Sequence, residues 1–170
     1  MGAMNDQIVE LHNPGLQIIL YSPFAVQELE KGGRYGERFP DGRDLVDHMN
    51  DCRVGAIGTR WPTHDYWLHL SSTMDQGVIA RASDHVRLGI EVQNGLLCVR
   101  AGDDLFDWPG PCPDEQLITL DSGAYAITAC MLPYDGEGAV RIYLHFAPTP
   151  ARPDLGYAMI PELYCEAPVF

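Results

Sequence analysis

Short apolar segments with a period of two, each ended by turn-forming residues, constrain the fold of this chain most strongly. Segments 86–93 and 96–100 flank Asn94-Gly95, a pair that tolerates the positive φ angles of a type I′ turn. Similar segments recur along the chain, and the turns between them contain Gly, Pro, Asn and Asp. The pattern predicts antiparallel β-structure, with further strands at 7–12, 16–21, 54–59, 66–71, 117–120, 124–132, 139–146 and 163–167.

The connections between these segments predict how the strands pair. Asn13-Pro14-Gly15 is expected to close a hairpin between 7–12 and 16–21. The turns at 121–123 and 135–138 are expected to join the three segments between 117 and 146 into a meander.

One helix is expected before the third strand. Leu45, Met49 and Cys52 fall on one helical face, and Asp41 can cap its start. Eight to ten short strands with one short helix predict a mainly β fold, an antiparallel two-sheet β-sandwich. We expect residues 1–170 to form a single domain, with residues 1–3 compatible with a remnant of cloning before Met4.

The net charge is strongly negative and unevenly distributed. The chain carries a formal charge of −13, and residues 101–170 contain 11 acidic but only 2 basic side chains. Such a field repels nucleic acids and anionic membranes and speeds encounter with a basic protein. A role in solubility alone remains the alternative interpretation.

The five cysteines are odd in number and widely spaced, without a CxxC pair. This spacing predicts neither a disulfide framework nor a zinc site. Cys98 and Cys130 are expected to be buried free thiols, and Cys112 is expected in a loop between two prolines. The N-terminal residues lack the pattern of a secretory signal, so a cytoplasmic location is expected.

The catalytic signals are weak. His64, Asp65 and His69 are the best metal candidates, but residues 64 and 69 of one strand point to opposite faces. No paired metal signature, phosphate loop or nucleophile elbow is present. We therefore predict no catalytic residue, no metal and no cofactor, and a small enzyme that uses these three residues stays an alternative.

A third possibility is a small-molecule-binding module in which Trp61, Tyr66 and Trp67 line a pocket. The alternation of residues 66–70 allows only one set of these side chains to face inward. Trp61 and Trp67 are interpreted mainly as core residues.

Residues 101–116, AGDDLFDWPGPCPDEQ, combine acidic and aromatic side chains with three prolines. Prolines reduce the entropy lost when a loop is fixed, and aromatic anchors ringed by charge are typical of protein interfaces. We call residues 101–116 the acidic segment. Its predicted partner-binding residues are Asp103, Asp104, Phe106, Asp107, Trp108, Asp114 and Glu115. The alternative is that Phe106 and Trp108 pack into the core.

The order of segments resembles the competence-nuclease inhibitor type and related bacterial immunity proteins. The matching pieces are LQIILYSPFAV, VGAIGTRW, VRLGIEVQNGLLCVR, ITLDSGAYAITACMLP and AVRIYLHF, within residues 16–146. The acidic segment and the tail after Phe146 are longer than in short members of that family. The resemblance implies a β-sandwich that binds a nuclease and blocks its active site.

A nuclease needs basic groups to hold phosphates, so an acidic inhibitor suits its surface. We therefore predict an immunity protein, not an enzyme, whose partner is a cognate basic toxin, a nuclease. No direct contact with nucleic acid or membrane is expected.

Overall fold

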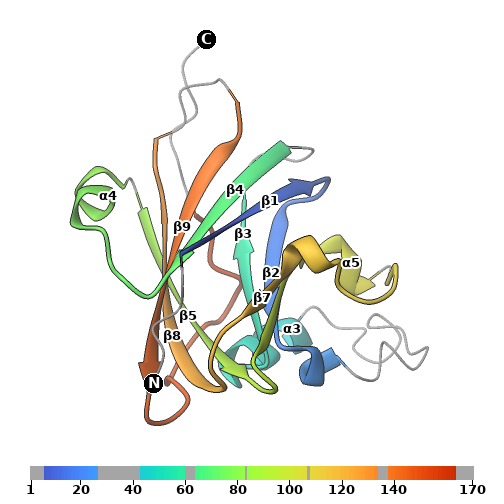
Figure 1. Cartoon of the computed structure of the whole chain (residues 1–170). Coiled ribbons are helices and arrows are strands. Elements are labelled where there is room, and N and C mark those ends of the chain that lie inside the picture. The colour runs from blue at the N-terminus through green and yellow to red at the C-terminus, as the bar shows by residue number, and fades with distance from the viewer. Residues whose placement is uncertain are drawn as a thin grey trace.

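The computed structural model describes residues 6–26, 43–59, 64–82, 84–106, 108–133 and 138–163. Within these ranges nine strands form two sheets that pack face to face (Figure 1). The five-stranded sheet has the order β1-β4-β9-β8-β5. Its strands are β1 (Gln7–Asn13), β4 (His64–Ser71), β9 (Val140–Thr149), β8 (Gly123–Met131) and β5 (Asp84–Val92).

The four-stranded sheet has the order β3-β2-β6-β7. Its strands are β3 (Val54–Gly58), β2 (Gln17–Tyr21), β6 (Leu96–Ala101) and β7 (Leu117–Thr119). Neighbouring strands are antiparallel except β4 and β9, which are parallel. The predicted mainly β, two-sheet sandwich is confirmed.

The core lies between the sheets and follows the period of two. On β4, Tyr66, Leu68 and Leu70 are almost fully buried, whereas Trp67 points outward and is 36% exposed. The interpretation of Trp67 as a core residue was wrong. Side chains alternate between the two faces of a strand, and on β4 the inward-facing residues are Tyr66, Leu68 and Leu70. Trp61 lies outside the described residues.

The turns at Asn13-Pro14-Gly15 and Asn94-Gly95 were located correctly, but each of them joins strands of different sheets. Residues 135–137 of the turn expected at 135–138 lie outside the described residues. Asn94 and Gly95 have φ angles of 59° and 68°, as a type I′ turn requires. Only Gln93 and Leu96 pair across this turn, after which β5 and β6 separate into the two sheets. The expected hairpin at Asn13-Pro14-Gly15 was wrong for the same reason, since β1 and β2 belong to different sheets.

The predicted meander is correct only in its second half. β8 and β9 form an antiparallel hairpin, but β7 pairs with β6 in the other sheet. A hydrophobic period identifies a strand and its buried face, but it does not identify the neighbour with which that strand pairs.

The expected helix is present as α3 (Arg43–Asn50). Leu45, Met49 and Cys52 are all buried, as their spacing predicted, and Asp41 lies outside the described residues. Cys52 has a φ of 59° and closes the helix, because its N–H bonds to the carbonyl oxygen of Met49 while Arg53 N–H bonds to that of His48.

The described residues contain four further helical turns, all of them short. They are η1 (Pro23–Val26), α4 (Gln76–Arg81), α5 (Asp103–Phe106) and η2 (Asp114–Gln116). None of them is long enough to show a helical period in the sequence. Among the described residues, no helix has the length and apolar character needed to cross a membrane.

The segment after β9 runs back to the edge of the four-stranded sheet. Asn50 and Tyr157 exchange two hydrogen bonds, and Arg152 donates to the carbonyl oxygen of Asp51. Gly58 N–H then bonds to Pro161, and a parallel bridge joins Gly58 to Glu162. Residues 164–167 of the expected last strand lie outside the described residues.

Candidate protein-binding site

The acidic segment covers the outer face of the four-stranded sheet. In the register of β2 and β6, Tyr21 pairs with Cys98 and Ile19 with Arg100, so these four side chains share one face. The opposite face of the same strands carries Leu20 and Val99 into the core. The segment leaves β6, forms α5 and returns through η2 to β7, and it lies beside the sheet in Figure 1.

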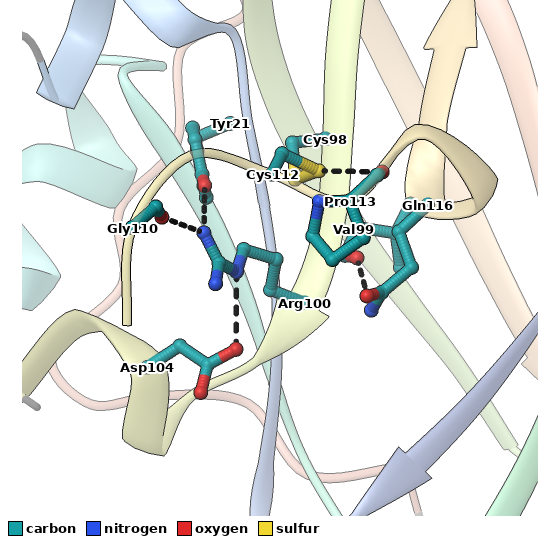
Figure 2. Close-up of a disulfide and its surroundings, with 9 residues drawn as sticks. All are labelled: Tyr21, Cys98, Val99, Arg100, Asp104, Gly110, Cys112, Pro113 and Gln116. Carbon is teal, nitrogen blue, oxygen red and sulfur yellow. Dashed lines mark hydrogen bonds and ion pairs between the residues drawn. A yellow bond between two sulfur atoms is a disulfide. The ribbon is translucent and has the colours of Figure 1, made fainter. Parts of the chain in front are cut away.

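A disulfide between Cys98 and Cys112 fixes the middle of the segment to β6, as Figure 2 shows. Its Cα atoms are 6.2 Å apart, within the normal range for a disulfide. The prediction that Cys98 is a free thiol, and that the chain has no disulfide, was wrong. This pairing could not be predicted from the sequence, because the two cysteines become neighbours only when the segment folds back over the sheet. Cys52 and Cys130 are free and buried.

Arg100 is the second attachment point, and its guanidinium is buried under the segment. Its Nε donates to a carboxylate oxygen of Asp104 at 3.0 Å. Its Nη1 donates to the carbonyl oxygen of Gly110 at 2.8 Å and to the hydroxyl oxygen of Tyr21 at 3.3 Å (Figure 2). One buried side chain therefore holds the start and the middle of the acidic segment against the sheet.

These partners keep Arg100 charged. Burial by itself lowers the pKa of the guanidinium, but the hydrogen bonds to Tyr21 and Asp104 raise the pKa above its ordinary value. A buried arginine with several well-placed acceptors is the arrangement that a buried charge requires.

Trp108 packs on this arginine. The guanidinium carbon of Arg100 lies 4.8 Å from the centre of the Trp108 ring, and the rings of Tyr21 and Trp108 are 6.1 Å apart. The indole is half-buried against the hydrophobic core cluster. Trp108 thus contributes to fixing the segment and also presents part of its surface to solvent.

The remaining acidic side chains of the segment differ in exposure. Asp103, Asp114 and Glu115 are exposed, whereas Asp104 is half-buried by its ion pair with Arg100. Asp107 and the side chain of Phe106 lie outside the described part of the structure. The segment therefore presents three described carboxylates outward and uses a fourth internally.

A glycine in the connection between the sheets allows Asp103 to approach the backbone. A Cβ atom added to Gly15 would lie 2.5 Å from a carboxylate oxygen of Asp103. Next to it, Gly102 donates its N–H to the carbonyl oxygen of Gln17 at 2.8 Å. Any side chain at position 15 would push Asp103 away, so the sequence leaves room here for the first turn of the segment.

The two alternative sites named from the sequence are not assembled. His64 and His69 are five residues apart on β4 and point to opposite faces, while Asp65 pairs with His12 at 2.6 Å. Tyr66 is in the core and Trp67 is on the outer face, so they do not line one pocket. Across the described ranges, no group of three His, Cys, Asp or Glu side chains is placed to hold a metal.

Sequence reasoning missed Arg100, Tyr21 and the disulfide as the supports of the segment. One signal was available for Arg100, since an arginine ends the apolar strand LLCVR directly before a segment with acids and no bases. A charged residue in such a strand needs a partner, and Asp104 is four residues away.

No family model and no curated protein matches this chain. Among solved structures, its fold is similar to that of a protein described as crocagin biosynthetic gene J. That match has a TM-score of 0.55 and 12% identity, and covers 84% of this chain and 98% of the other.

The fold is also similar to that of ComJ from Bacillus subtilis, an inhibitor of the DNA-degrading activity of NucA. The TM-score is 0.50 at 11% identity, over 87% of this chain and 98% of ComJ. At these identities the comparisons show a shared two-sheet fold, on which one neighbour inhibits a nuclease and the other belongs to a biosynthetic system.

Proposed function

We propose that this chain is an immunity protein that binds and inhibits a cognate nuclease toxin through the acidic segment. The observation that carries the proposal is the way this segment is held. The disulfide and Arg100 fix it on the sheet, while Asp103, Asp114 and Glu115 remain exposed.

A fixed acidic surface suits a nuclease partner. Nucleases hold phosphates with basic side chains, so their active-site surface is complementary to exposed carboxylates. Because the disulfide and Arg100 hold the described part of the segment in place, little conformational entropy is lost there when a partner binds. The fold shared with ComJ supports the same class of partner.

The residues of the segment have different roles in this proposal. Asp103, Asp114 and Glu115 contact basic groups of the nuclease directly. Asp104 and Trp108 keep the segment in place through Arg100, and the exposed part of the indole adds an apolar contact. Phe106 and Asp107 stay predicted contacts, on the sequence argument alone.

The test uses the proteins encoded by the genes beside that of this chain, purified and then selected for DNA-degrading activity. Plasmid degradation is followed while the chain is added in increasing amounts, and complex formation is measured by calorimetry. We expect inhibition that is complete at one equivalent. Full DNA degradation at a large excess of the chain, with no complex detected, contradicts the proposal.

A matched pair of triple variants then tests the surface. Asp103→Asn, Asp114→Asn and Glu115→Gln together should weaken binding at least about a hundredfold, roughly 2.7 kcal/mol. The control removes the same charge from exposed acids outside the segment, with Glu10→Gln, Asp121→Asn and Asp154→Asn. Equal weakening by both sets would show that net charge, not this surface, determines binding.

A further inference from the structure

A cavity of about 490 Å³ lies on the outer face of the five-stranded sheet. Its floor is a grid of six side chains on three neighbouring strands, fixed by the register. His69, Tyr143 and Cys130 form one row and Ser71, His145 and Thr128 form the next. The acidic segment covers the other sheet, so the cavity lies on the opposite side of the sandwich from the proposed nuclease surface.

The walls of the cavity are mainly apolar and come from both sides of the floor. Ile8, which is 58% exposed, stands beside His69 on β1. Met74, Val78 and Ile79 form the opposite wall. A cavity of this size, with apolar walls and a few polar groups, is typical of small-molecule sites.

The topology explains why the second wall is present. β4 and β5 are separated in the sheet by β9 and β8, so the chain between them must cross a face of the sheet. It crosses the outer face and forms α4 there, to one side of the sheet in Figure 1. Asp75 caps this helix through bonds from the N–H groups of Gly77 and Val78.

One polar atom of the cavity lacks a partner. The Nε2 atom of His69 is buried and has no hydrogen-bond partner among the described residues. Two other polar side chains of the cavity are paired: Ser71 donates to Asp6 at 2.7 Å, and His145 Nε2 donates to the carbonyl oxygen of Ser72 at 3.1 Å. A buried polar atom without a partner is rare in native proteins and indicates that something else supplies the bond.

The His69 ring is held in position, and its surroundings favour its uncharged form. It stacks on Tyr143, with ring centres 4.4 Å apart and an angle of 11° between planes. Burial, and then the charge of Arg141, lower its pKa. Burial also raises the pKa of the neighbouring Cys130 thiol, which favours the uncharged form of that group as well.

We propose that this cavity binds a small uncharged molecule whose apolar body lies against Ile8, Met74 and Val78 and whose polar group bonds to His69 Nε2. The carboxylates of Asp6 and Asp75 line the cavity and exclude anionic ligands. The volume accommodates a molecule at least as large as a bicyclic aromatic compound.

The test uses 2-naphthol as the probe and 2-naphthoate as its anionic counterpart. Binding is followed by NMR at the Met74 methyl group and the His69 imidazole C–H. We expect 2-naphthol to shift both signals with saturation, and 2-naphthoate to bind at least tenfold more weakly. Absence of saturation by 2-naphthol, or equal binding of both probes, contradicts the proposal.

Two histidine variants locate the polar contact. His69→Phe keeps the ring stacked on Tyr143 but removes the nitrogen, and it should weaken 2-naphthol binding at least tenfold. His85→Phe is the control, because His85 pairs with Cys130 at the far end of the same row and does not line the cavity. If both variants bind the probe as the unmodified chain does, His69 is not the contact. Nuclease inhibition is a separate readout, so either proposal can fail alone.

Discussion

The centre of the Trp108 ring lies 4.8 Å from the guanidinium carbon of Arg100, and this arginine is only 2% exposed. On the other sheet, Arg141 lies 5.6 Å from the ring centre of Trp67, but that indole is on an open surface. The two pairs combine the same residue types, and their burial differs. The acidic segment, which contains Trp108, covers Arg100, whereas Arg141 and Trp67 lie on the exposed outer face of the other sheet.

This difference predicts unequal effects of removing the two indoles. Trp108→Ala should lower the free energy of unfolding by about 2 kcal/mol, less than the ~3–5 kcal/mol of a fully buried indole. Trp67→Ala should lower it by less than about 1 kcal/mol, the contribution of an exposed cation–π pair. Urea unfolding measures both, and equal losses would contradict the assigned role of Trp108.

The disulfide predicts a stability that depends on reducing agent. Cys98 and Cys112 are 14 residues apart, and closing a loop of that length stabilises a protein by about 3 kcal/mol. Dithiothreitol should lower the free energy of unfolding of the oxidised chain by an amount of this order. The double variant Cys98→Ser and Cys112→Ser should be insensitive to dithiothreitol, and a response of that variant would point to another cause. Once the disulfide is reduced, the contacts of Arg100 and Trp108 would have to hold the segment.

The acidic surface predicts association with the nuclease that depends on salt. Charges act over about 8 Å at physiological ionic strength and over shorter distances as salt is added. The association rate measured by stopped flow should therefore fall steeply with salt, and the dissociation rate should change little. The triple variant of Asp103, Asp114 and Glu115 should show a flatter dependence. An association rate of the unmodified chain that does not change with salt would contradict electrostatic steering.

The environment of His69 predicts a loss of stability in mild acid. Its pKa in the folded chain is lowered, first by burial and then by Arg141, so the unfolded chain binds this proton more readily. The contribution to stability is present above the unfolded pKa of about 6.5 and is lost as pH falls through the lower folded pKa. Unfolding curves between about pH 7.5 and 5 should show a steeper decline for the unmodified chain than for His69→Phe. An equal decline in the free energy of unfolding of both proteins would contradict the lowered pKa of His69.

The sequence predicted the strands well and their partners poorly. Tyr66, Leu68 and Leu70 alternate with outward residues because the sandwich buries one face of β4, and this pattern is visible in the sequence. The turn at Asn94-Gly95 was also visible. The residues around this turn give no indication that β5 and β6 belong to different sheets, because strand pairing depends on strands far away in the sequence.

The supports of the candidate site could not be predicted, for a similar reason. Composition alone marks the acidic segment, but its supports come from β2 and β6, which contribute Tyr21, Cys98 and Arg100. The cavity was not predicted at all. Its floor joins side chains from residues 69 to 145 that are neighbours only across the sheet.

The position of β9 has a consequence for how the chain is made. Among the described residues it is the last strand along the chain, yet it lies in the middle of the five-stranded sheet, between β4 and β8. While a ribosome synthesises the chain, β4 and β8 each keep an open edge until Val140–Thr149 emerges. Unpaired edges are templates for aggregation. The pairing of β4 with β9 is also slow, because these two strands are far apart in the sequence. A chain that stops before residue 140 therefore lacks the strand that joins the two halves of the sheet.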